Sequence, residues 1–368
     1  MNRRNTGTIA ASFAVALTAL LFAFGSATPA AAFSFGGKKK APVAEAPPPE
    51  PEIPVGPPVL ARYVVDTASA YASYMQIASG ISSRFADGPS VSSALLVGAH
   101  SEQHQLQQGV VAYAAIVALQ DPAFVAAVRA FAAHASQRDA MVRYILADPN
   151  YVTTMAGHES AAGLIVAALN SQGVRLKTVG DQVKQAAYDV QRQGQWSKKP
   201  VPNPDIRLQQ VKQLSSAPLV APDDLRAQMQ QASSGAAPMV VSGQPLQAPY
   251  TQAVTRGMAL AALAILGKAG DTDMAYVMPM LINDGDGYCF SMSKLNLYQC
   301  LSVARPYYED VFCLGVHSLG DTGRCVMSTT GSADPVLPTT SPLIAAAGGT
   351  GGAATVATST LVRAPVNQ

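Results

Sequence analysis

Two histidine-containing segments carry side chains that could do chemistry. His100 and His104 in "AHSEQHQ" are four residues apart, a spacing at which one helix face presents two imidazoles to a metal ion. Ser101, however, is typical of a helix N-cap, which would start a new helix between the two histidines. The sequence contains no H-E-x-x-H pattern. We therefore predict no metal site and interpret both histidines as solvated.

The second segment, "GHESAAG", places His158, Glu159 and Ser160 side by side. Consecutive helical residues point in different directions, so these three cannot form a proton relay without a remote partner. The sequence also has no G-x-S-x-G, Walker loop or dinucleotide fingerprint. We predict no catalytic residue and no cofactor.

A third segment, "NDGDGYC" from Asn283 to Cys289, has the oxygen ligands and glycines of a Ca²⁺ loop. It lacks the closing Glu and the third acidic position that such a loop needs. We expect Asp286 to act as the N-cap of a following helix instead.

All four cysteines lie between Cys289 and Cys325. In a helix, the 11 residues from Cys289 to Cys300 put both thiols on one face but about 16 Å apart, too far to pair. "ARPYYED" then breaks the helix at Pro306. We expect a second helix from there to Gly320, where the glycine is a candidate C′ residue.

The midpoints of two cysteine pairs fall on this break, so an antiparallel helical hairpin would join Cys300 to Cys313 and Cys289 to Cys325. Of the other two connectivities, one unwinds the first helix and the other skews both bridges. A Zn²⁺ site is a rival interpretation, although no C-x₂₋₄-C pair is present. Each bridge should stabilise the fold by about 2–4 kcal/mol.

Three stretches, "MSKLNLYQCLSVARPYYEDVFCLGVHSLGDTGRC", "GVVAYAAIVALQDPAFV" and "VKQAAYDVQRQGQW", resemble an exported, alanine-rich protein family of alphaproteobacteria. The resemblance covers most of residues 60–326. It implies export but no activity, because none is assigned to the family.

The N-terminal residues resemble a secretory signal. Arg3 and Arg4 precede the apolar run Ile9–Phe24, and Ala30 and Ala32 suit an A-x-A cleavage site. The run is shorter than the ~20 residues of a spanning helix, and an uncleaved anchor is the alternative. No later segment is long and apolar enough to span a membrane. We expect a periplasmic or secreted protein, in an environment that permits disulfides.

The composition favours tightly packed helices and excludes a nucleic-acid-binding role. The 368 residues include 25 Lys and Arg against 23 Asp and Glu, a net charge of +2, so no basic footprint exists. Apolar residues make up 49%, much of it alanine, the best helix former. Asp121 followed by Pro122 is a typical helix start.

We predict an all-α fold: a helical bundle with one long heptad helix and a disulfide-clamped C-terminal hairpin, between a disordered spacer and tail. The expected segments are a signal peptide (1–32), a Pro-rich spacer (33–58), a helical bundle (59–198), an irregular connector with a short helix (199–249), a helical region with the Cys hairpin (250–326) and a disordered tail (327–368).

The long helix should begin near Ser160 and carry a heptad seam. The seam includes Ile165, Leu169, Gln172, Leu176, Val179 and Val183. It suits either the central helix of an intrachain bundle or a self-associating parallel dimer. Gly173 and Gly180 lie beside it and would let another backbone approach closely.

These observations predict a non-enzymatic envelope or secreted protein that binds a protein partner or associates with itself. A carrier of an apolar ligand between helices is an alternative. A divergent enzyme acting on an envelope polymer is another, with His158, Glu159 and the His100/His104 region as its only candidate residues.

Overall fold

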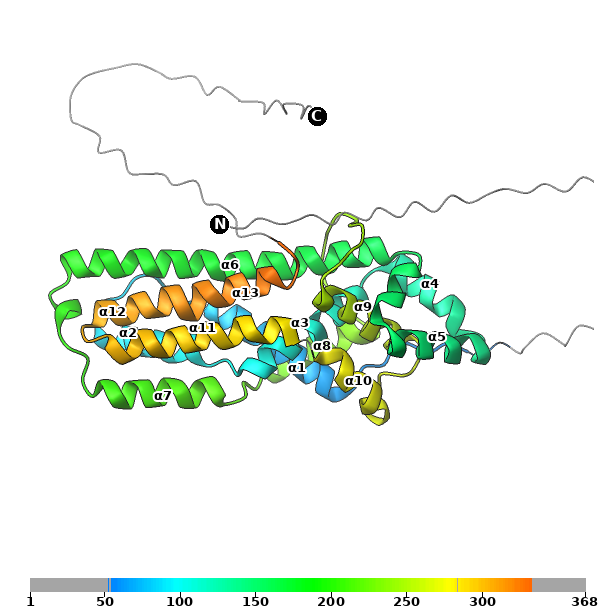
Figure 1. The fold of residues 1–368 in the computed structure, drawn as a ribbon, viewed down its shortest axis with the longest axis horizontal. Helices are drawn as coiled ribbons and strands as arrows, with labels where there is room; N and C mark the ends of the chain where they lie inside the picture. The colour runs from blue at the N-terminus through cyan, green and yellow to red at the C-terminus, as the bar shows by residue number, and fades with distance from the viewer. Residues whose placement is uncertain (1–51, 53, 283, 333–368) are drawn as a thin grey trace, which may run out of the picture. The chain divides into compact units, whose positions relative to one another are not determined.

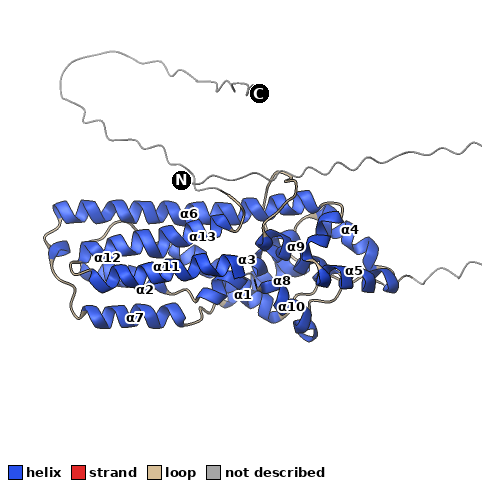
Figure 2. Cartoon of the chain, in the orientation of Figure 1, coloured by secondary structure: helices blue, strands red, loops and turns tan. Residues whose placement is uncertain are grey.

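The computed structural model describes residues 52, 54–282 and 284–332. The predicted signal peptide, most of the spacer and the tail from 333 onward lie outside these residues. Within them the chain is helical and has no β-strand (Figure 2), which confirms the all-α prediction.

The first part of the fold contains five helices: α1 (Arg62–Ala78), α2 (Gly88–Ala99), α3 (Gln103–Ala118), α4 (Pro122–Ala132) and α5 (Ala135–Ala147). The predicted helix start is confirmed, because the Asp121 carboxylate accepts a hydrogen bond from the Phe124 amide at 2.7 Å. Among the described helices, none taken singly is long and apolar enough to cross a membrane. Only α3 and α4 together pass that test, as a pair bent by 86°.

The long helix is α6 (His158–Gln193), 36 residues that end at Gly194. Helix α6 packs against the chain's own helices, chiefly the π-helix Leu314–Gly320, α13 (Asp321–Ser328), α12 (Tyr307–Cys313) and α3. Ile165, Leu169, Leu176 and Val183 are fully buried there, while Gln172 and Val179 are partly buried. The alternative that these residues form a self-association seam between two chains is therefore wrong, because the interior of the bundle already covers their side chains. The intrachain alternative describes the structure.

Residues 199–249 contain two helices, α7 (Pro204–Ser216) and α8 (Asp223–Ser234), where one short helix was predicted. Helix α7 buries only Arg207, Val211 and Ser215, spaced four residues apart on one face. A single buried apolar side chain leaves almost no hydrophobic periodicity in the sequence, so the helix was missed.

The remaining helices are α9 (Gln252–Ile265), α10 (Met274–Leu281), α11 (Asp284–Val303), α12 (Tyr307–Cys313) and α13 (Asp321–Ser328). Helix α9 buries 12 of its 14 residues, as its apolar sequence predicts. It packs against α3, and α13 packs against α6 (Figure 1). The segments before and after the connector therefore share one hydrophobic core.

Helix α6 and the C-terminal helices meet backbone to backbone at glycines. A Cβ atom on Gly180 would lie 2.6 Å from the Gly320 nitrogen, and one on Gly323 would lie 2.6 Å from the Lys177 nitrogen. A Cβ on Gly173 would lie 2.8 Å from the Gly323 oxygen. The close approach predicted from Gly173 and Gly180 is present, and its partner is the cysteine-containing segment.

Candidate functional site

The cysteine hairpin is the most strongly constrained part of the structure. Helix α11 runs antiparallel to one continuous helical segment formed by α12, a π-helix from Leu314 to Gly320 and α13. The predicted helix end at Gly320 is wrong, because Gly320 keeps right-handed helical dihedrals and lies against Gly180. The second arm of the hairpin therefore extends to Ser328.

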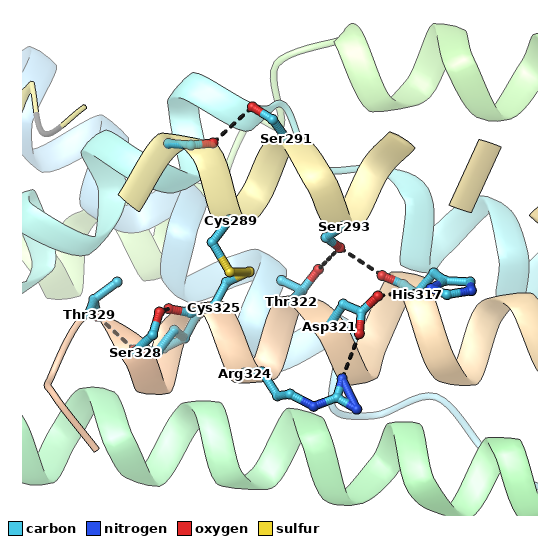
Figure 3. The surroundings of a disulfide bond; sticks show 12 residues. Cys289, Ser291, Ser293, His317, Asp321, Thr322, Arg324, Cys325, Ser328 and Thr329 are labelled. Carbon is cyan, nitrogen blue, oxygen red and sulfur yellow. Dashed lines mark hydrogen bonds and ion pairs between the residues drawn. A yellow bond between two sulfur atoms is a disulfide. The ribbon is translucent and has the colours of Figure 1, made fainter. Parts of the chain in front are cut away.

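Two disulfides join the arms, Cys289 to Cys325 and Cys300 to Cys313, with Cα–Cα distances of 5.6 and 5.7 Å. These are the two pairs predicted from the sequence. Figure 3 shows the first of them between α11 and α13. Because one bridge closes each end of the arms, the hairpin cannot splay apart.

The π-helix places Cys313 and Cys325 on the same face of the second arm, so that both can form bridges to α11. Cys289 and Cys300 are 11 residues apart, but Cys313 and Cys325 are 12 apart. At ~100° per residue, 12 α-helical steps would turn Cys325 about 120° away from the face of Cys313. A π-turn, with its i to i+5 hydrogen bonds, takes up one extra residue. The 12 residues from Cys313 to Cys325 therefore turn through about the same angle as 11 α-helical residues. Cys313 and Cys325 then lie on one face of their arm, as Cys289 and Cys300 do on α11.

The turn end of the hairpin is held by α7. The Arg207 guanidinium bonds to the Asp310 carboxylate and to the Leu301 carbonyl oxygen, all inside the protein. Burial raises the pKa of Asp310 to about 6, and its Oδ2 atom has no hydrogen-bond partner. Sequence reasoning missed this pair, because an arginine in a polar helix is typical of a solvated face.

The other end of α7 is held by a second, partly buried cation. The Lys294 ammonium donates to the Ser215 carbonyl oxygen at 2.8 Å, and burial lowers the pKa of Lys294 to about 8. Two basic side chains therefore attach α7 to the hairpin, one at each end of the helix.

An apolar groove of about 220 Å³ opens where α6 meets the turn end of the hairpin. Its lining residues are Ala187, Tyr188, Gln191, Cys300, Val303, Ala304, Tyr308, Glu309, Phe312 and Cys313. Tyr188 and Phe312 meet edge to face, with ring centroids 6.1 Å apart. Val303 is 73% exposed and Tyr188 is 40% exposed, so the apolar wall faces solvent.

The groove is suited to binding rather than to catalysis. The carboxylate of Glu309 is the only charged group in its lining, and its Oε2 atom accepts a hydrogen bond from the Arg305 amide at 2.8 Å. The volume is below the ~300–1,000 Å³ of typical small-molecule sites but can admit one or two apolar side chains. Because both disulfide arms support its walls, the groove is preformed.

The residues of "GHESAAG" do not form a relay. The Ser160 hydroxyl donates to the Gly157 carbonyl oxygen of its own helix start, and Glu159 lies on the rim of an open hollow of about 550 Å³. His158 contacts Tyr250, with Nδ1 2.9 Å from the hydroxyl. That hydroxyl donates its one proton to the Leu246 carbonyl oxygen, so the hydrogen bond between His158 and Tyr250 is donated from Nδ1 of the histidine.

The two other predicted segments need corrections of detail. His100 follows the end of α2 while His104 lies in α3, so they do not share a helix. The N-cap between them is Glu102 rather than Ser101, because the Glu102 carboxylate accepts from the His104 and Gln105 amides. Helix α11 begins at Asp284, which puts Asp286 inside its first turn and not at the N-cap.

One charged cluster was not predicted. His317 Nδ1 lies 2.8 Å from one Asp321 oxygen, and the Arg324 guanidinium bonds to the other (Figure 3). Burial raises the pKa of Asp321, but the hydrogen bonds and charges of His317 and Arg324 outweigh it, so the pKa ends below its usual value. Across the described residues, no group of three or more His, Cys, Asp or Glu side chains is arranged to hold a metal ion.

Comparison with known proteins assigns no relative to this chain: no protein-family model, no curated protein and no solved structure matches it.

Proposed function

We propose that this chain is an exported, non-enzymatic protein of the cell envelope or the secreted fraction, and that it acts by binding a protein partner. The single observation that carries the proposal is the apolar groove beside Cys300 and Cys313. Contiguous apolar surface exposed on a preformed hollow is typical of interaction sites.

Two features support export. The N-terminal sequence has the charge, apolar run and cleavage pattern of a secretory signal. Both disulfides pair all four cysteines of the chain, which is typical of oxidising compartments. The resemblance to an exported family points the same way.

The chemistry of the groove indicates the kind of partner. Tyr188, Val303 and Phe312 would surround an aromatic or branched aliphatic side chain. Because Glu309 is the one charged lining residue, the partner segment should carry a basic residue about one helical turn from its apolar anchor. The small volume of the groove disfavours the apolar-ligand carrier, since it would bury little of a lipid chain.

A site-specific photo-crosslinking experiment in the native host tests this function. A benzophenone amino acid replaces Val303 in the groove or, as matched control, Leu295 on the same helix. Both side chains are exposed, at 73% and 45%, but only Val303 lines the groove. We expect one envelope or secreted protein to crosslink at position 303 and not at 295.

The crosslinked protein is then purified and its binding measured directly. Val303→Asp should weaken the dissociation constant at least ~10-fold, because it places a carboxylate beside Glu309 in an apolar contact, whereas Leu295→Asp should not. Equal crosslinking at both positions, or unchanged binding by Val303→Asp, would contradict the proposal.

A further inference from the structure

The lining of the groove at Val303 includes a disulfide bond. Cys300 and Cys313 are bonded to each other, and both are among the residues that line the groove. The bridge joins α11 to α12, the two helices of the hairpin that form one side of the groove. A thiolate can attack a sulfur–sulfur bond when it has access to one of the two sulfur atoms. The groove therefore holds a reactive group as well as an apolar surface.

The two cysteines of this bridge differ in exposure. Cys300 is partly buried, whereas Cys313 is only 1% exposed. Val303 lies about one helical turn after Cys300 on α11, is 73% exposed and lines the same groove. The solvent-exposed wall of the groove is therefore next to Cys300. A nucleophile in the groove should attack Cys300, with Cys313 as the leaving group.

The turn of the hairpin does not depend on this bridge alone. The Arg207 guanidinium bonds to the carboxylate of Asp310, three residues before Cys313. It also bonds to the carbonyl oxygen of Leu301, directly after Cys300. The guanidinium and the bridge therefore connect the same two arms at the same end. If the bridge opens, the bonds of Arg207 still hold the turn and the walls of the groove together.

The two bridges also differ in the length of chain that they close. The sequence separation is 13 residues for Cys300–Cys313 and 36 residues for Cys289–Cys325. In the chain-entropy account, a bridge that closes a shorter loop stabilises the fold less. Opening Cys300–Cys313 therefore costs less stability, and Cys289–Cys325 continues to hold the far ends of the arms. The short bridge is the one suited to open and re-form in a folded chain.

We propose that the Cys300–Cys313 bridge is a site of thiol–disulfide exchange with a protein dithiol that binds in the groove. The proposal rests on the proposed function and adds that the partner segment carries a cysteine. The thiolate of that cysteine attacks Sγ of Cys300, a mixed disulfide forms, the Cys300–Cys313 bond breaks, and Cys313 leaves as a thiolate.

A second thiol of the partner completes the exchange. It attacks the partner's own sulfur in the mixed disulfide and releases Cys300. The two protons of the partner's thiols end on Cys300 and Cys313. The bridge is thus reduced to two thiols, and the partner's dithiol is oxidised to a disulfide, with two electrons transferred to this chain.

Peptide mapping of the full, oxidised chain treated with 2-mercaptoethanol tests the site without a partner. Acid quenching stops the exchange and traps the mixed disulfides, because only thiolates attack. We expect Cys300–Cys313 to open at least ~10-fold faster than Cys289–Cys325. The first adduct should be on Cys300, with a free thiol at Cys313. Equal opening rates of the two bridges, or a first adduct on Cys313, would overturn the proposal.

A matched pair of variants shows whether the attack comes through the groove. Val303→Trp places a large ring in the groove beside Cys300, whereas Leu295→Trp places it on an exposed part of the same helix outside the groove. Because exchange requires access to the sulfur, Val303→Trp should slow the opening of Cys300–Cys313 at least ~5-fold. Leu295→Trp should leave the rate unchanged. The same rate in both variants would contradict attack from the groove.

A double variant, Cys300→Ser with Cys313→Ser, checks that the chain stays folded when the bridge is open. Circular dichroism should show the helix content of the unmodified chain, and peptide mapping should still find Cys289–Cys325. Loss of the helices would contradict a reversible exchange. None of these measurements uses the partner, so their failure leaves the crosslinking at position 303 unaffected. Conversely, failed crosslinking with normal exchange would reject the protein partner and leave Cys300 as a reactive site.

Discussion

The guanidinium of Arg207 and the carboxylate of Asp310 form an ion pair in the protein interior, although 103 residues separate them in the chain. The pair joins α7 to the turn of the disulfide hairpin. The same guanidinium also bonds to the Leu301 carbonyl oxygen near the end of α11. One side chain thus connects three helices at the end of the bundle that carries the groove.

Removing one partner of this pair should be costly. Arg207→Met leaves the Asp310 carboxylate buried without its cation, and we expect a loss of about 3–5 kcal/mol in the free energy of unfolding. The double variant Arg207→Met with Asp310→Leu should recover much of that loss, because no uncompensated charge remains. Urea unfolding measures both values. A double variant as unstable as the single one would contradict a role based on charge.

The same pair should make stability depend on pH. Burial raises the pKa of Asp310 from 3.8 to about 6 in the folded chain, so between these values the folded state holds the proton more tightly than the unfolded state. Stability from this group therefore rises as pH falls from 7 to 5, by about 1 kcal/mol.

Denaturant unfolding at pH 7 and pH 5 checks the sign, with Asp310→Asn as reference. The asparagine variant should lack this rise. The lowered pKa of Asp321 acts in the opposite direction, but its contribution is lost below its usual titration range, outside this window. If the variant shows the full pH dependence, the assignment to Asp310 fails.

The glycine contacts predict an unusual cost for a helix-favouring change. Alanine is normally better than glycine in a helix by about 1 kcal/mol. At Gly180, however, the new Cβ would lie 2.6 Å from the Gly320 nitrogen, and neither backbone can yield without moving a helix. We expect Gly180→Ala to destabilise by about 1–3 kcal/mol in thermal or urea unfolding. Thr178→Ala, on the exposed side of α6, should be near neutral.

Because of the π-helix, we expect one single-residue deletion to leave the native disulfide pairing unchanged. Removing His317 would convert the π-turn to α-helix, so Cys313 and Cys325 would still share a face. Removing Asn296 from α11 has no such compensation and rotates Cys289 by ~100° relative to Cys300. Non-reducing peptide mapping should find both native bridges in the first variant and not in the second. The opposite result would show that the π-turn does not set the register.

Several features followed from local sequence. The helix start at Asp121 depends on a hydrogen bond between a side chain and an amide three residues apart. The position of α9 follows from a nearly continuous apolar run. The disulfide pairs followed from counting residues about Pro306. In each case the governing interaction is short-range or is set by chain connectivity, so the sequence is sufficient.

Only the tertiary structure decided which surfaces remain exposed. The heptad seam of α6 suited a dimer as well as a bundle, and burial of Leu169 and Leu176 by the chain's own helices resolved the choice. The π-turn and the groove at Val303 had no signal in the sequence, and α7 had almost no hydrophobic periodicity. They arise where residues far apart in the chain meet, and the energy of such contacts depends on packing geometry, which side-chain periodicity does not encode.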